Sequence, residues 1–203
     1  RVLSVNSDPL SIYNSLRSTS FFDTYAIVEE DKVRIRDYKS QIDRNKLKKK
    51  YTTEDFLRNL ELCASIRHLN RGMLPRAIQL LSKTNQFNLT TKRHNQETLN
   101  NMLIDSSYIL LMLSLSDRFG DQGEVGLCIA TIDSKQEVSI DSFLLSCRAI
   151  GRGAEYALWD ALIKSVEETS CTIKAEYIAT LKNTVTADFY TTVTRPAAVY
   201  RGN

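Results

Sequence analysis

The sequence predicts an α/β (α+β) fold in which a mixed central sheet is flanked by helices. Three strand-like runs follow one another at 108–116, 125–132 and 138–150, with turn-forming residues between them. The most regular amphipathic helix of the chain, at 154–168, follows the third run directly. From residue 62 onward the elements read strand, two helices, three strands, helix, strand and helix, and this order predicts the mixed sheet.

Composition and charge are those of an ordinary globular protein. Of the 203 residues, 42% are hydrophobic and 25% are charged, so the chain can bury one substantial core and is not expected to be disordered. The net charge of +3 is small. The basic run at 46–50 is interpreted as a solvated helix face, although it could also touch phosphates or an acidic partner. No apolar run reaches the length of a membrane span. We therefore expect neither a nucleic-acid nor a membrane partner.

The cysteines and histidines do not form a metal-binding pattern. The chain has two histidines and four widely spaced cysteines: Cys63, Cys128, Cys147 and Cys171. This spacing argues against a zinc site and against a small disulfide scaffold, so we expect no metal. Cys63, Cys128 and Cys147 lie in apolar segments, as buried reduced thiols do, which favours a cytoplasmic protein.

Residues 1–50 differ in pattern from the rest of the chain. We expect a short strand at 1–5, a helix from Pro9 to Leu16 and an apolar corner at 21–23. The stretch 29–50 is rich in charge and predicts a linker helix that packs on one side only. A domain boundary is therefore expected near residue 50. The chain begins without an initiator Met or a signal peptide, so we expect it to be part of a longer protein.

Residues 51–203 form the second expected domain. A helix ending at Leu60 is predicted to be capped by Thr52 or Thr53. The remaining expected elements are strands at 62–69 and 172–178 and helices at 74–87, 96–104 and 186–192.

The junction between the third strand and the amphipathic helix contains the pattern Arg148-x-x-Gly151-x-Gly153. Glycines let backbone N–H groups approach a ligand closely, and the N–H groups at a helix start form an anion site. Arg148 and Arg152 add positive charge, so a phosphate or a pyrophosphate is the expected ligand. The alternative is a tight turn that needs glycine for its geometry alone. The expected ligand-binding residues here are Leu145, Cys147, Arg148, Ala149, Ile150, Gly151, Arg152, Gly153 and Ala154.

The Arg-x-x-Gly-x-Gly spacing and the order of the surrounding elements are similar to those of the GNAT acyltransferases. This resemblance implies a domain at 51–203 that binds acyl-CoA or another phosphopantetheine thioester. Asn183 and Tyr190 resemble the GNAT residues that contact the pantetheine arm and protonate the departing thiolate. Tyr190 could instead be a core residue. After Tyr190 the sequence departs from the family pattern, because no glycine follows until Gly202.

Three segments, 83–93, 115–121 and 140–153, further resemble the FkbH-like proteins of HAD-superfamily subfamily IIIC, and residues 1–50 resemble the end of their HAD domain. Members of that family transfer a glyceryl unit to an acyl carrier protein in polyketide and related pathways. The resemblance therefore implies an acyl carrier protein and an N-terminal HAD domain as partners. The Asp-x-Asp-x-Thr motif of the phosphatase step is not in this chain.

A polar segment after the helix at 74–87 could supply hydrogen bonds to a polar acceptor, or it could be a capping and turn network. The expected acceptor-binding residues are Asn85, Gln86, Asn88, Thr90, Thr91, Arg93 and Arg118. Asp141 could act as a catalytic base with Tyr190 as the acid, or it could only pair with Arg118 or Arg93. Cys147 is interpreted as a packing residue rather than a nucleophile.

Three functions fit these patterns. The first is an acyltransferase domain of an FkbH-like protein. The second is a module that binds the phosphopantetheine arm of a carrier protein for a neighbouring HAD domain, without chemistry of its own. The third is a structural or dimerising domain.

Overall fold

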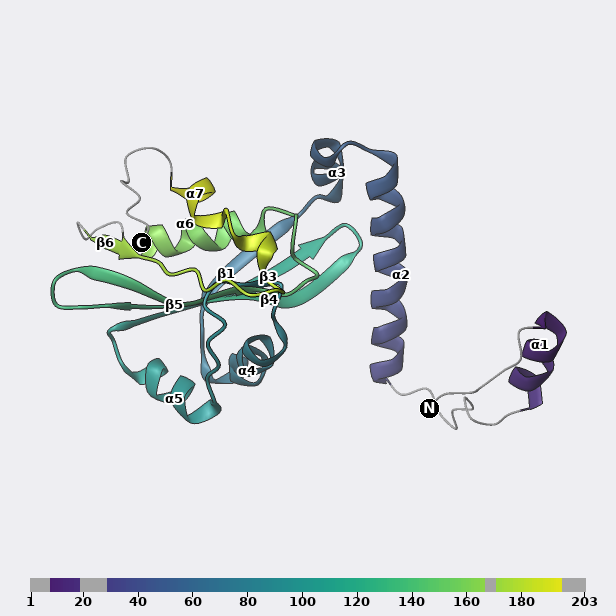
Figure 1. Ribbon diagram of the computed structural model, residues 1–203, viewed down its shortest axis with the longest axis horizontal. Helices are drawn as coiled ribbons and strands as arrows, with labels where there is room; N and C mark the ends of the chain where they lie inside the picture. The colour runs from purple at the N-terminus through teal and green to yellow at the C-terminus, as the bar shows by residue number, and fades with distance from the viewer. Residues whose placement is uncertain (1–7, 19–28, 167–170, 195–203) are drawn as a thin grey trace. The chain divides into compact units, whose positions relative to one another are not determined.

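The structure, a computed structural model, describes residues 8–18, 29–166 and 171–194 (Figure 1). The chain forms two compact units, Arg1–Ile42 and Asp43–Asn203, which are described separately. In the first unit, α1 spans Pro9–Ser18, and the Asp8 carboxylate accepts the N–H of Ser11 at 2.7 Å. Helix α2 spans Glu29–Lys50, as the charge-rich pattern predicted, and its residues 43–50 belong to the second unit. The strand expected at 1–5 and the corner at 21–23 lie outside the described residues.

The second unit is built on a mixed sheet. Its strands are β1 (Cys63–His68), β2 (Phe87–Asn88), β3 (Tyr108–Asp117), β4 (Gly120–Ile132), β5 (Glu137–Leu145) and β6 (Thr172–Lys174). The hydrogen-bonded order is β1-β3-β4-β5, and the outer edge of β5 pairs with β6 and with β2. Among the strand pairs of the described residues, only β5–β6 is parallel. The predicted mixed sheet is therefore confirmed.

Helices cover both faces of this sheet (Figure 1). The helices of the second unit are α3 (Thr53–Leu60), α4 (Leu74–Lys83), α5 (Gln96–Ile104), α6 (Ala154–Val166) and α7 (Phe189–Val193). Alternate residues of β3 point to opposite faces. Leu111 and Leu113 pack with α6, whereas Leu110 and Met112 pack with α4 and α5. The two resulting apolar clusters hold the helices against the sheet.

Local capping explains where several helices begin. Thr52, one of the two residues expected to cap α3, accepts the N–H of Asp55 at 3.2 Å. Asn95 caps α5 by accepting the N–H of Thr98 at 2.8 Å, and α5 has the predicted bounds. In the part of the chain that the structure describes, no helix is both long enough and apolar enough to cross a membrane.

Five predicted elements differ clearly in length, and one of them is β4, which begins at Gly120 and not at residue 125. Helix α4 ends at Lys83, because Thr84 turns extended and Phe87–Asn88 pair with β5 as the unpredicted strand β2. Strand β5 ends at Leu145, because the residues that follow it turn toward α6. Strand β6 stops at Lys174, and the last predicted helix is divided into a 3-10 turn at Thr184–Thr186 and the short helix α7.

Candidate functional site

The loop from Ser146 to Gly153, which we call the glycine loop, joins β5 to the start of α6. Its first turn is fixed internally: the N–H of Ser146 donates to Val125 at 2.7 Å, and the N–H of Ala149 donates back to Ser146 at 2.9 Å. Gly151 and Gly153 have φ angles of 73° and 75°. Side chains rarely adopt this left-handed backbone, so both glycines are required by the loop's conformation.

The backbone N–H groups that follow this turn are available to a ligand. The N–H groups of residues 150–154 donate no hydrogen bond of good geometry to the described protein atoms, although residues 147–153 form turns. A Cβ placed on Gly151 would meet no atom within 4 Å, so the space in front of it is open. Of these residues Gly151 is exposed and Ala154 is buried. Unbonded N–H groups at the start of the 13-residue helix α6 suit a phosphate or diphosphate.

Two arginines add positive charge on one side of the glycine loop. Arg148 is exposed, and Arg76 on α4 donates to the carbonyl of Glu124 at 2.7 and 2.9 Å. The pKa of Arg76 is lowered, first by burial and then by the nearby charge of Arg148. The two guanidinium groups therefore share one region of the surface, which favours an anionic ligand there.

Arg152, predicted as a ligand-binding residue, is instead part of a buried ion network. Its guanidinium donates to Gln122 at 2.9 Å and lies 3.5 Å from Asp117, whose side chain is 0% exposed. Arg44 of α2 binds the same carboxylate through two hydrogen bonds of 2.6 and 2.9 Å. Burial and the charge of Arg44 lower the pKa of Arg152. Two arginines thus share one aspartate behind the glycine loop and anchor its backbone to α2 and β3.

Glu155 places a carboxyl group at the first turn of α6. Burial raises its pKa, while a hydrogen bond from its own backbone N–H opposes this effect. Its Oε2 atom is buried and has no hydrogen-bond partner among the described residues. A negatively charged Glu155 would compete with an anionic ligand for the helix start.

Asn183 and Tyr190, the residues matched to pantetheine binding and protonation, are both buried. The Asn183 amide donates to the carbonyls of Asn88 and Ile178 at 2.8 and 2.9 Å, and its oxygen accepts the N–H of Thr180 at 2.7 Å. The Tyr190 ring packs on Trp159 with 5.9 Å between ring centroids, within a cluster of aromatic rings. Asn183 therefore fixes the segment that follows β6 against strand β2. Tyr190 lies in the core.

The outer edge of β5 beyond its pairing with β6 is covered by the chain itself. Phe87 and Asn88 pair with the last two residues of β5. Leu89 continues this contact, because its N–H donates to Phe143 at 3.1 Å while its carbonyl accepts the N–H of Ile178 at 2.8 Å. An extended ligand cannot add to this part of the β5 edge unless the segment 87–89 moves.

The polar segment predicted to face an acceptor is largely bonded internally. The Asn88 oxygen accepts the N–H of Thr91 at 2.9 Å, and the Thr90 hydroxyl donates to the carbonyl of Asp141 at 2.7 Å. Arg93 donates to the Asn85 oxygen at 2.7 Å. These contacts correspond to the capping and turn network considered as the alternative. The two other predicted residues are Gln86, which is exposed, and Arg118, which donates to the carbonyl of Asn59 at 3.3 Å.

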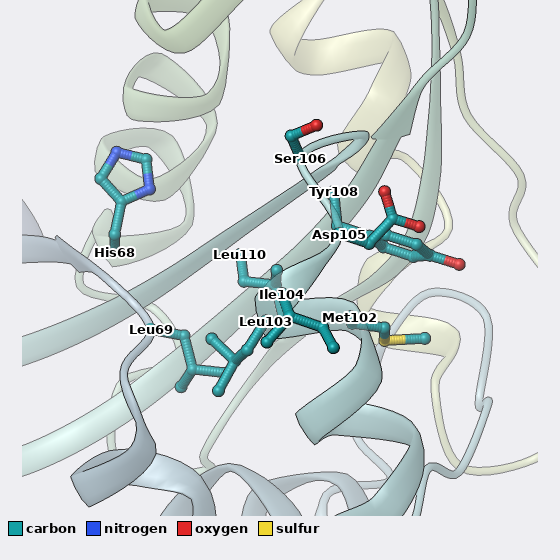
Figure 2. A pocket seen from close by; sticks show the side chains of 9 residues that line it. All are labelled: His68, Leu69, Met102, Leu103, Ile104, Asp105, Ser106, Tyr108 and Leu110. Atoms are coloured by element: carbon teal, nitrogen blue, oxygen red, sulfur yellow. The ribbon is translucent and has the colours of Figure 1, made fainter.

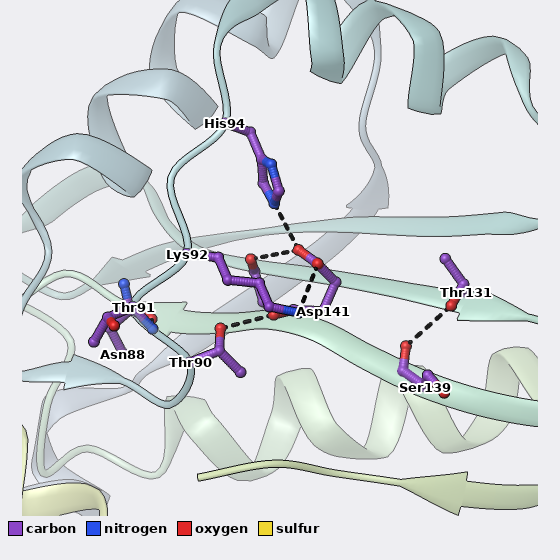
Figure 3. Close-up of polar contacts among 9 residues, drawn as sticks. Asn88, Thr90, Thr91, Lys92, His94, Thr131, Ser139 and Asp141 are labelled. Atoms are coloured by element: carbon purple, nitrogen blue, oxygen red, sulfur yellow. Dashed lines mark hydrogen bonds and ion pairs between the residues drawn. The ribbon is translucent and has the colours of Figure 1, made fainter. Parts of the chain in front are cut away.

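Asp141 lies at the centre of a polar cluster that sequence reasoning described incompletely (Figure 3). The expected ion pair with Arg93 or Arg118 is wrong: the carboxylate accepts Lys92 Nζ at 3.0 Å and lies 2.6 Å from His94 Nε2. Burial alone would raise the pKa of Asp141, but hydrogen bonds from His94, Ser142 and Lys92 and the charge of His94 outweigh it, so the pKa is lowered. His94 is one of only two histidines and was not selected from the sequence.

The lowered pKa predicts how Asp141 contributes to stability. A carboxylate whose folded pKa lies below its unfolded value, ordinarily ~3.9, stabilises fully above that value and loses the contribution as the pH falls through the folded pKa. We expect the difference in unfolding free energy between the native protein and Asp141→Asn to be larger at about pH 5 than at about pH 3, where protonation of the carboxyl group removes it. Urea unfolding at a series of pH values measures it, and a difference independent of pH would contradict the assignment.

Two cysteine predictions are also wrong. Cys63 and Cys147 are exposed, whereas Cys128 is buried, and burial raises the pKa of its thiol. Cys147 lies in the glycine loop just beyond β5, where the chain leaves the core, so it is not the packing residue that was expected.

A cavity of 310 Å³ lies away from the glycine loop, between β1, α5 and the start of β3 (Figure 2). Leu69, Met102 and Leu110 form part of its apolar lining. None of the residues predicted as a site from the sequence lines this cavity.

Comparison with known proteins supports the fold and no closer relationship. No protein-family model matches the chain, and no curated protein matches it. Among solved structures, AAC(6′)-Iy in complex with the bisubstrate analogue CoA-S-monomethyl-acetylneamine is similar at 16% identity and a TM-score of 0.50, over 70% of this chain and 99% of that one. A transcriptional regulator from Bacillus halodurans C-125 gives 16% identity and a TM-score of 0.50, over 70% and 98%. The ribosomal-protein-S18-alanine N-acetyltransferase from Escherichia coli gives 14% identity over 64% and 76%, with a TM-score of 0.47.

The second unit therefore has the GNAT acetyltransferase fold that the loop spacing and element order predicted. At these identities the likeness shows the fold alone.

Proposed function

We propose that this protein is a GNAT-like acyltransferase that takes its acyl group from CoA or from the pantetheine arm of an acyl carrier. The observation that carries the proposal is the set of unbonded backbone N–H groups at residues 150–154, at the start of α6. Such groups suit the diphosphate that joins pantetheine to the adenosine of CoA. Arg148 and Arg76 would add long-range attraction for it.

In the reaction, the protein binds and orients the acyl thioester and the acceptor. The glycine loop would hold the diphosphate, and the thioester supplies an activated acyl group to an amine or hydroxyl acceptor. Holding two reactants in a productive geometry can supply much of the rate. The resemblance of 83–93, 115–121 and 140–153 to FkbH-like proteins supports the finer proposal of a glyceryl group and an acyl carrier partner beside a HAD domain.

A module that grips a carrier's phosphopantetheine without chemistry is the second candidate. It is favoured by the burial of Tyr190, since this residue matches the acid of the enzymes.

Calorimetric titration with CoA, acetyl-CoA and holo- and apo-acyl carrier protein, followed by a transfer assay, separates these candidates. Binding of CoA with acyl transfer supports the enzyme. Binding of the holo-carrier without transfer supports the module. A protein that binds neither CoA nor the holo-carrier contradicts both.

Glu155 provides a graded test of the helix-start site. We expect Glu155→Gln to tighten CoA binding about fivefold, because removing one competing charge at a helix terminus is worth about 1 kcal/mol. Asp160→Asn is the matched control, since Asp160 is exposed further along α6 and pairs with Lys164. Calorimetry measures both, and an unchanged or weaker affinity in Glu155→Gln would argue against diphosphate binding at the start of α6.

A further inference from the structure

A β-bulge places Asp141 outside the regular pairing of β5. Ile129 of β4 pairs with Ser142, whereas the next residue, Ala130, pairs with Ile140, so Asp141 is an extra residue. Bulges occur frequently beside active sites, where they re-aim a side chain. Here the bulge brings the Asp141 carboxylate next to the Ser142 hydroxyl, which donates to it at 2.8 Å.

His94 is held by this carboxylate in one orientation (Figure 3). The His94 Nε2 atom lies 2.6 Å from Asp141 Oδ1, and Lys92 Nζ lies 3.0 Å from Oδ2. Because an ionised carboxylate only accepts hydrogen bonds, Nε2 carries a proton, and a neutral imidazole then has its lone pair on Nδ1. Within residues 8–18, 29–166 and 171–194, Nδ1 of His94 makes no hydrogen bond.

The cluster is open to solvent on one side. The side chains of His94, Asp141 and Lys92 are 14%, 21% and 41% exposed. The Asp141 carboxylate is partly buried and orients the imidazole, whose second nitrogen makes no hydrogen bond. This is the arrangement of a general base.

We propose that His94 is the general base of acyl transfer and that Asp141 is its positioning residue. This inference rests on the proposed function. The acceptor nitrogen or oxygen forms a bond to the thioester carbonyl carbon, and the carbon–sulfur bond breaks. The sulfur leaves with the bonding electron pair as a thiolate, which solvent protonates. The proton lost by the acceptor passes to Nδ1 of His94.

The position along β5 agrees with this role. Asp141 lies four residues before Leu145, the last residue before the glycine loop, so about 14 Å of strand separates them at ~3.4 Å per residue. The diphosphate and the thioester stand at opposite ends of an extended pantetheine arm. A base for the thioester end is therefore expected at about this distance from the diphosphate site, reached by an arm that runs beside the segment 87–89 and not along the covered β5 edge.

His94→Gln tests the assignment, because glutamine can still donate to Asp141 but cannot take up the acceptor's proton as imidazole does. We expect kcat for acyl transfer to fall by about 10²- to 10⁴-fold, with acyl-CoA affinity unchanged. Added imidazole should restore part of the rate in His94→Gln, above the rate without protein. Asp141→Asn should lower kcat while keeping affinity, and His68→Gln, the change at the other histidine, should leave kcat unchanged.

The outcomes separate the two proposals. Transfer by the native protein that survives in His94→Gln overturns the role of His94 and leaves the acyltransferase intact. A kcat loss without rescue by imidazole, accompanied by a lower unfolding temperature in His94→Gln and His94→Asn, shows a structural role and also overturns it. If the native protein binds acyl-CoA but does not transfer the acyl group, both the role of His94 and the acyltransferase activity are overturned. If it binds neither CoA nor the carrier, the proposed function itself is refuted.

Discussion

Asp117→Asn is expected to lower the unfolding free energy by about 3–5 kcal/mol, the cost of removing one partner from a buried ion pair. The carboxylate is 0% exposed, and it is bound by Arg44 at 2.6 Å and lies 3.5 Å from Arg152. Without it, two guanidinium groups remain buried with no counter-charge. The loop backbone between Gly151 and Gly153 would lose its anchor at the same time. Urea unfolding measures the change.

Asp43→Asn is the matched control for this prediction. Asp43 is on the same helix as Arg44 and pairs with Lys46, but both side chains are at least half exposed. Such surface pairs contribute about 0–1 kcal/mol. If Asp117→Asn and Asp43→Asn destabilise the protein equally, the Arg44–Asp117–Arg152 network does not hold the loop as described.

Gly151→Val is expected to weaken CoA binding by about 10- to 150-fold. The φ of 73° disfavours a β-branched residue, so the backbone must rotate and carry a neighbouring N–H away from the ligand. Losing one hydrogen bond to a charged group costs about 1.5–3 kcal/mol, which corresponds to that range. The space around Gly151 is open, so the loss comes from the backbone and not from a clash with the protein.

Gly123→Val separates this effect from general destabilisation. Gly123 has a φ of 66° with no atom within 4 Å of its Cβ position, so it imposes a similar strain outside the glycine loop. Calorimetry should show near-native CoA affinity in Gly123→Val and the large loss in Gly151→Val. An equal loss in both variants would show that the glycine loop has no special part in binding.

Features set by local sequence were predictable. The bounds of α5, the Thr52 cap and the glycines at the start of α6 depend on residues close together in the chain, where periodicity, capping and backbone preference act directly. The mixed sheet followed from the order of these local elements. The site residues were harder, because a loop pattern does not determine where its side chains point.

Features set by distant pairing were not predictable. Strand β2 has two residues and forms because Phe87 pairs with Leu145 of the neighbouring strand β5. Arg152 was expected to face the ligand, but Asp117 and Gln122 hold it inward, and Gln122 lies 30 residues away from it. His94 was missed because its partner Asp141 is 47 residues away. Contacts of this kind appear only once the fold brings the segments together.

Backbone N–H signals measured by nuclear magnetic resonance during titration with CoA, and separately with pantetheine, test the diphosphate site most directly. Pantetheine lacks the diphosphate but keeps the arm. We predict that CoA shifts the N–H signals of residues 150–154 and that pantetheine leaves them unchanged. Shifts of equal size with both ligands, or CoA-induced shifts that avoid the glycine loop, would contradict binding of a diphosphate at the start of α6.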